Sequence, residues 1–248
     1  KIHASEKSDF TINLANSFRG PDLFSKYNFA DGVIPNPDLE PEKGVFYELG
    51  YAYNAQKFKL NANFYQNFLD NLYVPVSVDF QGTPAVQNQA VGEAKLTGFE
   101  YELSYSIGTL SDIFWTGSYI RGKNEVTNED LAFMPASQNI FGFQIRNSSD
   151  TFFGRLEGIF TGKQDRPAPT ERETDAYSLF NLSAGVNLHR AFPKLPYSKF
   201  VLSVDNLTDK EYQSHVFRGT PGNQTRFFAP GRSINAQLII RFGVASKH

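Results

Sequence analysis

The residues of this chain offer no recognisable set for breaking bonds. We find no G-x-S-x-G nucleophile turn, no H-E-x-x-H metal motif and no phosphate-binding glycine loop. The four histidines, His3, His189, His215 and His248, are scattered without metal-ligand spacing, and there is no cysteine. We therefore expect no catalytic residue, no metal site and no bound cofactor, and an enzyme is disfavoured.

Recognition of a ligand is better supported, because cationic and aromatic side chains occur together in long polar segments. Such side chains bind anionic chelates through charge and ring contacts. The candidate ligand-binding residues are Arg19, Tyr27, Arg166, His215, Phe217, Arg218, Arg226 and Phe227. Two alternatives stay open: the arginines pair with neighbouring acids or bind lipopolysaccharide phosphate, and His215 is a solvated surface side chain.

The elements that would position these segments are strands with one apolar face. Val45, Tyr47, Leu49 and Tyr51 alternate with Glu48 and Gly50, and a period of two indicates a β-strand. The same alternation recurs about ten times. It predicts strands near residues 8–18, 45–54, 57–68, 94–107, 111–122, 137–147, 151–161, 178–189, 198–206 and 232–242.

The connections between these strands alternate in length. Short turns follow the second, fourth and sixth strands, and a somewhat longer one spans 190–197, whereas 19–44, 69–93, 123–136, 162–177 and 207–231 are long. Tilted strands of about ten residues span about 23 Å, which suits the apolar band of an outer-membrane barrel with short periplasmic turns and long extracellular loops. The pattern thus favours an all-β, antiparallel transmembrane β-barrel.

The composition is compatible with this fold. Aromatic residues make up 15% of the 248 residues, and rings line both interfaces of membrane barrels. The net charge of -2 gives no reason to expect a nucleic acid partner. No apolar run is long enough for a transmembrane helix.

Motifs spread over most of the chain give it a family resemblance. They are Phe18 to Pro21, Asn36 to Lys43, Gly98 to Glu102, Val204 to Tyr212 and Pro230 to Ser233. In this order they resemble the TonB-dependent receptor family, the siderophore and haem receptors of the Gram-negative outer membrane. The motif residues to which we assign structural roles are Phe18, Pro21, Asn36, Pro37, Pro41, Glu42, Asn206, Leu207, Gly231, Arg232 and Phe242.

The resemblance implies a barrel of roughly 22 strands, of which residues 1–242 would supply about the last ten. Residues 243–248 would be a short extension after Phe242, the aromatic residue on which such barrels usually end. No plug domain is recognisable in this chain, so we expect it and the preceding strands elsewhere. The implied partners are the TonB energy-transducing complex, acting through that plug, outer-membrane lipid and lipopolysaccharide, and a transported ligand, most often a ferric siderophore.

Alternative ligands and functions stay open. The motifs at 18–21 and 36–39 look like paired boxes of haem receptors, but residues 22–35 contain no histidine to bind haem iron. Copper is disfavoured because Met134 is the only methionine. Cobalamin, another metal chelate or an oligosaccharide would also suit the fold. A self-closed porin or adhesin of ten strands and a soluble carbohydrate-binding β-protein are the competing classes.

The polar faces of the predicted strands carry charges of both signs. Such a surface suits hydrogen-bonded contact with a plug better than an ion-selective pore, which is a hypothesis about the barrel interior. The residues concerned are Glu48, Glu100, Glu102, Gln144, Arg146, Arg155, Glu157 and Arg241.

Overall fold

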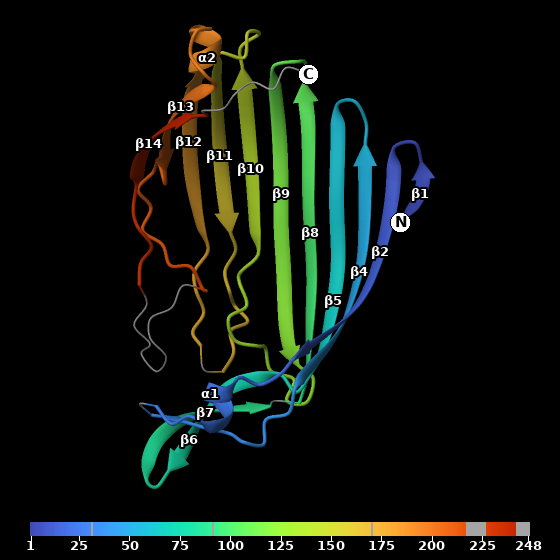
Figure 1. The fold of residues 1–248 in the computed structure, drawn as a ribbon, viewed down its shortest axis with the longest axis vertical. Helices are drawn as coiled ribbons and strands as arrows, with labels where there is room; N and C mark the ends of the chain where they lie inside the picture. Colours follow the sequence, from blue (N-terminus) through green and yellow to red (C-terminus); the bar gives the residue numbers. More distant parts are fainter. Residues whose placement is uncertain (31, 91, 170, 217–226, 242–248) are drawn as a thin grey trace.

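The chain forms a large, curved antiparallel sheet with a small second sheet at one end (Figure 1). The structure, a computed structural model, describes residues 1–30, 32–90, 92–169, 171–216 and 227–241. The large sheet has 11 strands in the order β1-β2-β4-β5-β8-β9-β10-β11-β12-β13-β14, and the small sheet has the order β3-β7-β6. Among the described residues the large sheet is open, with β1 and β14 at its edges.

The strands of the large sheet are β1 (Ile2–Ser5), β2 (Ser8–Arg19), β4 (Glu42–Asn54), β5 (Phe58–Asp70), β8 (Glu93–Ile107), β9 (Ser111–Asn124), β10 (Gln138–Arg146), β11 (Phe152–Thr161), β12 (Tyr177–Asn187), β13 (Ser198–Asp205) and β14 (Ser233–Ile240). The small sheet contains β3 (Val33–Ile34), β6 (Tyr73–Phe80) and β7 (Thr83–Ala90), and the helices are α1 (Leu23–Tyr27) and α2 (Leu188–Ala191). The prediction of an all-β antiparallel barrel wall with ten long strands is confirmed, and in this structure the barrel is partial.

Short turns join the strands at one end of the large sheet, and long connections emerge at the other (Figure 1). We call these the short-turn end and the long-loop end. Two segments predicted as loops contain further strands. The connection from β5 to β8 holds the β6–β7 hairpin, and β3 from the preceding long connection pairs in parallel with β7. Together with α1 they form a cap beyond the long-loop end.

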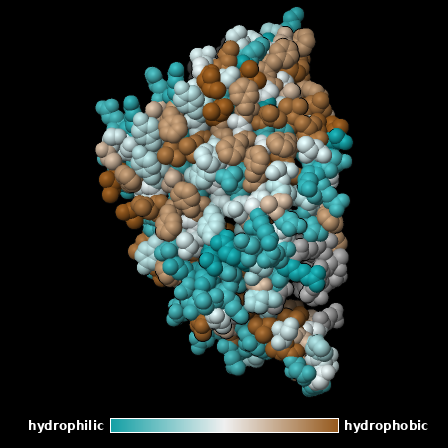
Figure 2. Space-filling model, turned by 180° about the vertical axis from the view of Figure 1, so that it is seen from behind, coloured by the Kyte–Doolittle hydropathy of each residue, from teal (hydrophilic) through white to brown (hydrophobic). Residues whose placement is uncertain are grey.

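One face of the large sheet is apolar and exposed. Leu49, Phe64 and Phe99 lie directly opposite one another on β4, β5 and β8, and each is more than 40% exposed. Only six apolar side chains among the described residues are buried, so the sheet covers no conventional core. Figure 2 shows most hydrophobic residues in the half toward the short turns, with a broad hydrophilic area toward the long loops. Such a band is typical of a surface that faces lipid.

The opposite face is polar and hollowed. One hollow is lined by polar side chains that include Asn61, Asn63, Glu100 and Ser118. Asn13 donates a hydrogen bond of 3.0 Å to Glu48 on the same face. The polar-face residues predicted from the alternation therefore lie where they can meet water or another part of the protein.

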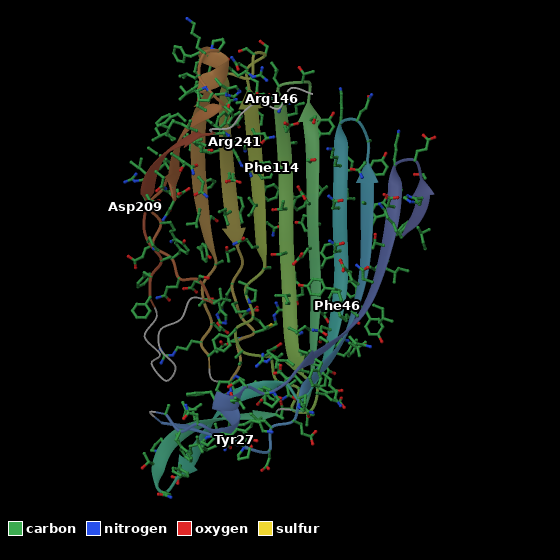
Figure 3. All side chains as sticks on the ribbon, in the orientation of Figure 1. Tyr27, Phe46, Phe114, Arg146, Asp209 and Arg241 are labelled. Atoms are coloured by element: carbon green, nitrogen blue, oxygen red, sulfur yellow. The ribbon has the colours of Figure 1, made fainter. Side chains whose placement is uncertain are left out.

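A second hollow on this face combines charges and a ring. Asp112 accepts hydrogen bonds from Ser106 and Gln144, and the Arg155 guanidinium lies 4.2 Å from the centre of the Phe114 ring. Arg155 also donates to Glu157 over 2.6 Å. In Figure 3, Phe114 and Arg146 lie toward the short-turn end, whereas Tyr27 lies on the cap. The charges of this second hollow thus interact with one another and with the Phe114 ring.

Close packing on the polar face makes Gly185 sensitive to substitution. A Cβ atom there would meet the Phe153 ring and would lie 2.5 Å from the Phe200 carbonyl oxygen, which belongs to the neighbouring strand. Since a backbone atom cannot move aside cheaply, we expect Gly185→Ala to cost about 1–3 kcal/mol of stability. The temperature at which the folded band is lost in semi-native electrophoresis measures this effect.

Gly154→Ala is the matched control, because the nearest atom to a Cβ at Gly154 is 3.7 Å away, an ordinary contact. The control should leave the transition temperature nearly unchanged. Equal effects of the two substitutions would contradict the close approach at Gly185.

Candidate functional site at the long-loop end

The cap is held together by buried polar contacts between two long connections. The Asn36 backbone N–H donates a hydrogen bond of 2.8 Å to the Ser25 carbonyl oxygen. The Asn36 side chain donates a second bond, of 3.0 Å, to the Asn88 carbonyl oxygen on β7. Asn88 in turn donates to the Ser25 hydroxyl, and Ser25 is buried. Asn36 therefore links the connection after β2 to the β6–β7 hairpin.

Helix α1 begins with a side-chain cap. The Asp22 carboxylate accepts from the Ser25 backbone N–H and hydroxyl, and these hydrogen bonds lower the pKa of Asp22. Folding lowers the pKa of Asp22, so the cap stabilises α1 at pH values above the ordinary pKa of an aspartate. This stabilisation is lost as the pH falls through the pKa that Asp22 has in the folded protein. Pro21 directly precedes this cap.

Glu42 anchors the cap to the wall. Its carboxylate accepts 2.9 Å from the Tyr73 backbone N–H at the start of β6, and it lies 3.2 Å from the Arg19 guanidinium at the end of β2. The Arg19 guanidinium also lies 5.6 Å from the centre of the Tyr73 ring. The Tyr73 hydroxyl donates to the Glu40 carbonyl oxygen next to Pro41. The motif residues 36–42 thus join the first two long connections.

Three other long connections meet at Glu171. This carboxylate, 7% exposed, accepts from the Phe133 backbone N–H over 3.0 Å and from the Ala168 backbone N–H over 3.1 Å. His215 Nε2 lies 3.4 Å from the same carboxylate, and His215 Nδ1 lies 3.3 Å from the Thr174 hydroxyl. We call this group, Phe133, Ala168, Glu171, Thr174 and His215, the Glu171 cluster.

His215 lies inside the Glu171 cluster and is not solvated. Its side chain is 4% exposed, so the alternative of a surface histidine does not describe it. Nearby, Gln164 is 3% exposed and donates to the carbonyl oxygens of Met134 and Pro135. No motif in the sequence predicts this arrangement, because the partners come from connections that are far apart along the chain.

Arg166 lies on the outer side of this region. It donates a 2.6 Å hydrogen bond to the Tyr119 hydroxyl, and its guanidinium lies 5.2 Å from the centre of the Tyr119 ring. Tyr119 pairs with Phe99, which belongs to the apolar face. Arg166 therefore lies against the outward face of the wall.

The motif residues 204–212 and 230–233 meet where β13 ends and β14 begins. Asn206 is 5% exposed and has a φ of 52°; its side chain accepts from the Lys210 backbone N–H and donates to the Lys210 carbonyl oxygen. The Leu207 backbone N–H donates to the Phe180 carbonyl oxygen on β12. Asp209 accepts from the Arg232 backbone N–H over 2.8 Å, beside Gly231. We call this arrangement the β13–β14 joint.

Three of the candidate ligand-binding residues have accessible side chains. The Arg19 side chain is 67% exposed, Tyr27 is 64% exposed and Phe227 is 49% exposed. Phe18 is also exposed, at 70%. Phe217, Arg218, Arg226 and Phe242 lie outside the described residues. The structure thus places accessible cationic and aromatic groups at the long-loop end, but it does not gather the described candidates at one point.

No group of three or more His, Cys, Asp or Glu side chains in the described part of the chain could hold a metal ion. None of its helices is long and apolar enough to cross a membrane.

A curved sheet with an exposed apolar face, a polar inner face and long loops at one end defines a segment of barrel wall. Residues 5–207 match the family described as TonB dependent receptor-like, beta-barrel. The chain belongs to this family.

The chain is 24% identical, over 91% of its length, to the hemoglobin-haptoglobin utilization protein B of Neisseria meningitidis serogroup C. It spans about a third of that relative, 33% of its length.

Solved structures show the same fold. The copper transporter OprC matches with a TM-score of 0.83 at 19% identity, over 96% of this chain and 38% of that one. The ferric enterobactin receptor of Pseudomonas aeruginosa matches with a TM-score of 0.72 at 17% identity, and the FrpB iron transporter of Neisseria meningitidis with 0.70 at 15%. Each covers 95% of this chain, which corresponds to 38% and 37% of the respective neighbour.

Proposed function

We propose that this chain is part of the wall of an outer-membrane barrel that imports a scarce nutrient in a TonB-dependent manner. The observation that carries the proposal is the pairing of an exposed apolar face with a polar, hollowed face on one sheet, in a chain that belongs to the TonB-dependent receptor family. The apolar face then contacts lipid, the polar face lines the lumen, and the long-loop end is extracellular.

The open edges of the sheet support a larger barrel. Unpaired N–H and C=O groups of an edge strand are costly in lipid, so β1 and β14 need neighbours. Further strands of the same barrel would supply them, and a plug domain would occupy the polar face, where Glu100, Glu102 and Asn63 are available for hydrogen bonds. TonB would act through that plug.

An iron chelate is the ligand that we favour, a ferric siderophore first. Exposed arginine and aromatic side chains at the long-loop end suit an anionic chelate. The names of two structural neighbours refer to iron or ferric enterobactin. The copper transporter matches at 19% identity, which reports on the fold, and the single methionine of this chain does not favour copper.

Haem or a haem protein is the second candidate, favoured by the relative named for hemoglobin-haptoglobin utilization. Residues 22–35 contain no histidine, and His215 is enclosed in the Glu171 cluster. A haem ligand from this chain would therefore require His215 to leave Glu171, so haem recognition through other contacts is more compatible with the structure.

Growth of the native organism on defined iron sources tests the function. Deletion of the gene for the full-length protein should abolish growth on one ferric siderophore, or on haemin or haemoglobin. A separate strain that lacks TonB should show the same loss. Unchanged growth on every iron source would contradict iron uptake. An intact mass near 28 kDa for the native protein would favour a small self-closed barrel, and extraction without detergent would favour a soluble protein.

A further inference from the structure

Lys199 projects from the polar face of the large sheet near the short-turn end. Its ammonium lies 4.1 Å from the centre of the Phe153 ring, which covers Gly185 on the strand between them. Because glycine has no side chain, the ring can lie against the sheet with one surface turned toward the lysine. A cation over a ring is attracted to it and keeps donors free for an anion. The ring therefore holds the ammonium in place over the polar face.

Arg241, directly after β14, is held in the same way. Its guanidinium lies 4.7 Å from the centre of the Tyr197 ring, and the His189 ring packs against Tyr197 with 4.6 Å between ring centres. Figure 3 shows Arg241 toward the short-turn end. Ile239 pairs with Lys199, so Arg241, two residues further on, is the diagonal neighbour of Lys199 on the same face. Diagonal neighbours lie about 7–8 Å apart, so one oxyanion can reach both side chains.

The charges of these two cations are not balanced by acids. Among the described residues neither Lys199 nor Arg241 forms an ion pair. The sequence has no Asp or Glu in residues 176–204 or 233–241, which form β12, β14 and all of β13 except its last residue. The short-turn end of these strands therefore carries a net positive charge that an anionic ligand can neutralise.

The rest of the polar face differs in charge. In the second hollow the Arg155 guanidinium also covers a ring, that of Phe114, but it is bonded to Glu157 over 2.6 Å. The first hollow, further toward the long loops, is lined by Glu100 and Glu102 and by no cation. An anion on this face is repelled from the first hollow and attracted to the two unpaired cations, so its free energy falls toward the short-turn end.

We propose that Lys199 and Arg241 form an anion-binding site on the luminal wall at the periplasmic exit of the barrel, and that it binds a carboxylate of the imported chelate. The lysine supplies a compact charge and the arginine a planar fork of donors, and both make strong charge-assisted hydrogen bonds to a carboxylate. The site lies at the other end of the wall from Arg19 and Tyr27. It therefore binds the chelate after those residues release it, an order that rests on the orientation and import given under Proposed function.

Titration of the full-length protein in detergent with citrate, a small carboxylate-rich anion, tests the site. Isotope-labelled methyl groups on the lysine side chains keep their charge and give each lysine an NMR signal, and Lys199→Arg assigns the signal of Lys199. We expect this signal to shift saturably with citrate. Arg241→Gln should raise the citrate concentration at half-saturation about tenfold, because it removes one charge-assisted contact.

Two further variants separate the site from general effects of charge and folding. Arg241→Lys keeps the charge, so its half-saturation should stay within about threefold of the wild-type value. Arg190→Gln removes an exposed cation of α2 at the same end, which has no ring contact or ion pair among the described residues, and should leave the half-saturation unchanged.

A Lys199 signal that does not respond to citrate would overturn the proposal and would leave another part of the protein, such as a plug carboxylate, as the partner of the two cations. Equal half-saturation in Arg241→Gln and the wild type would also overturn it. An equal rise in Arg241→Gln and Arg190→Gln would assign the effect to general attraction by positive charge, with the same consequence.

Uptake of radioactive iron from the chelate that supports growth links the site to import. The Lys199→Gln/Arg241→Gln variant should take up this iron about threefold or more slowly than the wild type while binding the chelate at the cell surface equally well. Equal uptake by the two would contradict a role of the site in import. Citrate binding at Lys199 without chelate-dependent growth of the wild type would contradict the proposed function and leave the anion site in place.

Discussion

Replacement of Asn206 by leucine should lower the stability of the folded protein by about 2–5 kcal/mol. The substitution removes both side-chain hydrogen bonds to Lys210 from a residue that is 5% exposed. It also places a branched side chain at a φ of 52°, a conformation that asparagine tolerates better than most residues. The temperature at which the folded form disappears in semi-native electrophoresis should fall markedly.

Asn206→Gly separates the two contributions. Glycine adopts a positive φ without strain but cannot bond to Lys210, so its transition temperature should lie between those of the leucine variant and the wild type. If the leucine variant were as stable as the glycine variant, the positive φ at residue 206 would not contribute to the loss of stability.

The β13–β14 joint also shows which parts of the structure could be predicted. The ten long strands follow from a period of two, and a one-residue slip would exchange the apolar and polar faces, so the pattern fixes both strand and face. Val204 to Tyr212 is recognisable as a strand end from its Asp, Asn and Thr residues. Its pairing with Arg232 could not be predicted, because that contact closes across a long connection.

The β6–β7 hairpin was missed for a different reason. Pro75 interrupts an otherwise alternating segment, and the prediction treated residues 69–93 as a loop. In the structure β6 is an edge strand of the small sheet, a position at which a missing N–H is tolerated. The turn is made by Gln81 and Gly82, both with positive φ, and the first of these residues is not a typical signal for such a turn.

The candidate site was predictable only in residue type. Cations and rings in long connections could be read from the sequence, but burial depends on partners elsewhere in the chain. His215 and Arg166 illustrate this, since Glu171 encloses the first and Tyr119 holds the second against the outer face.

Glu171→Ala should release the connections that meet at the Glu171 cluster. The buried carboxylate accepts from the backbone N–H groups of Phe133 and Ala168, and its removal leaves two donors without this acceptor. A donor that loses its partner costs about 1–3 kcal/mol, so amide hydrogen exchange at these two residues should accelerate by about fivefold to about 150-fold. Exchange in β9 and β11 should change little, because the strand ladders do not depend on this side chain.

Two further variants make the result specific. Glu173→Gln changes an exposed acid in the same connection, 2.5 Å from Lys163, and should leave exchange at Phe133 and Ala168 unchanged. Glu171→Gln keeps one acceptor oxygen but loses the charge beside His215, so its exchange should lie between that of the alanine variant and the wild type. Equal protection in the alanine variant and the wild type would mean that the three connections are held by other contacts. If Glu171→Ala loosens the loops while the wall stays folded, an accompanying fall in ligand affinity would mean that the order of these loops at the long-loop end contributes to ligand binding.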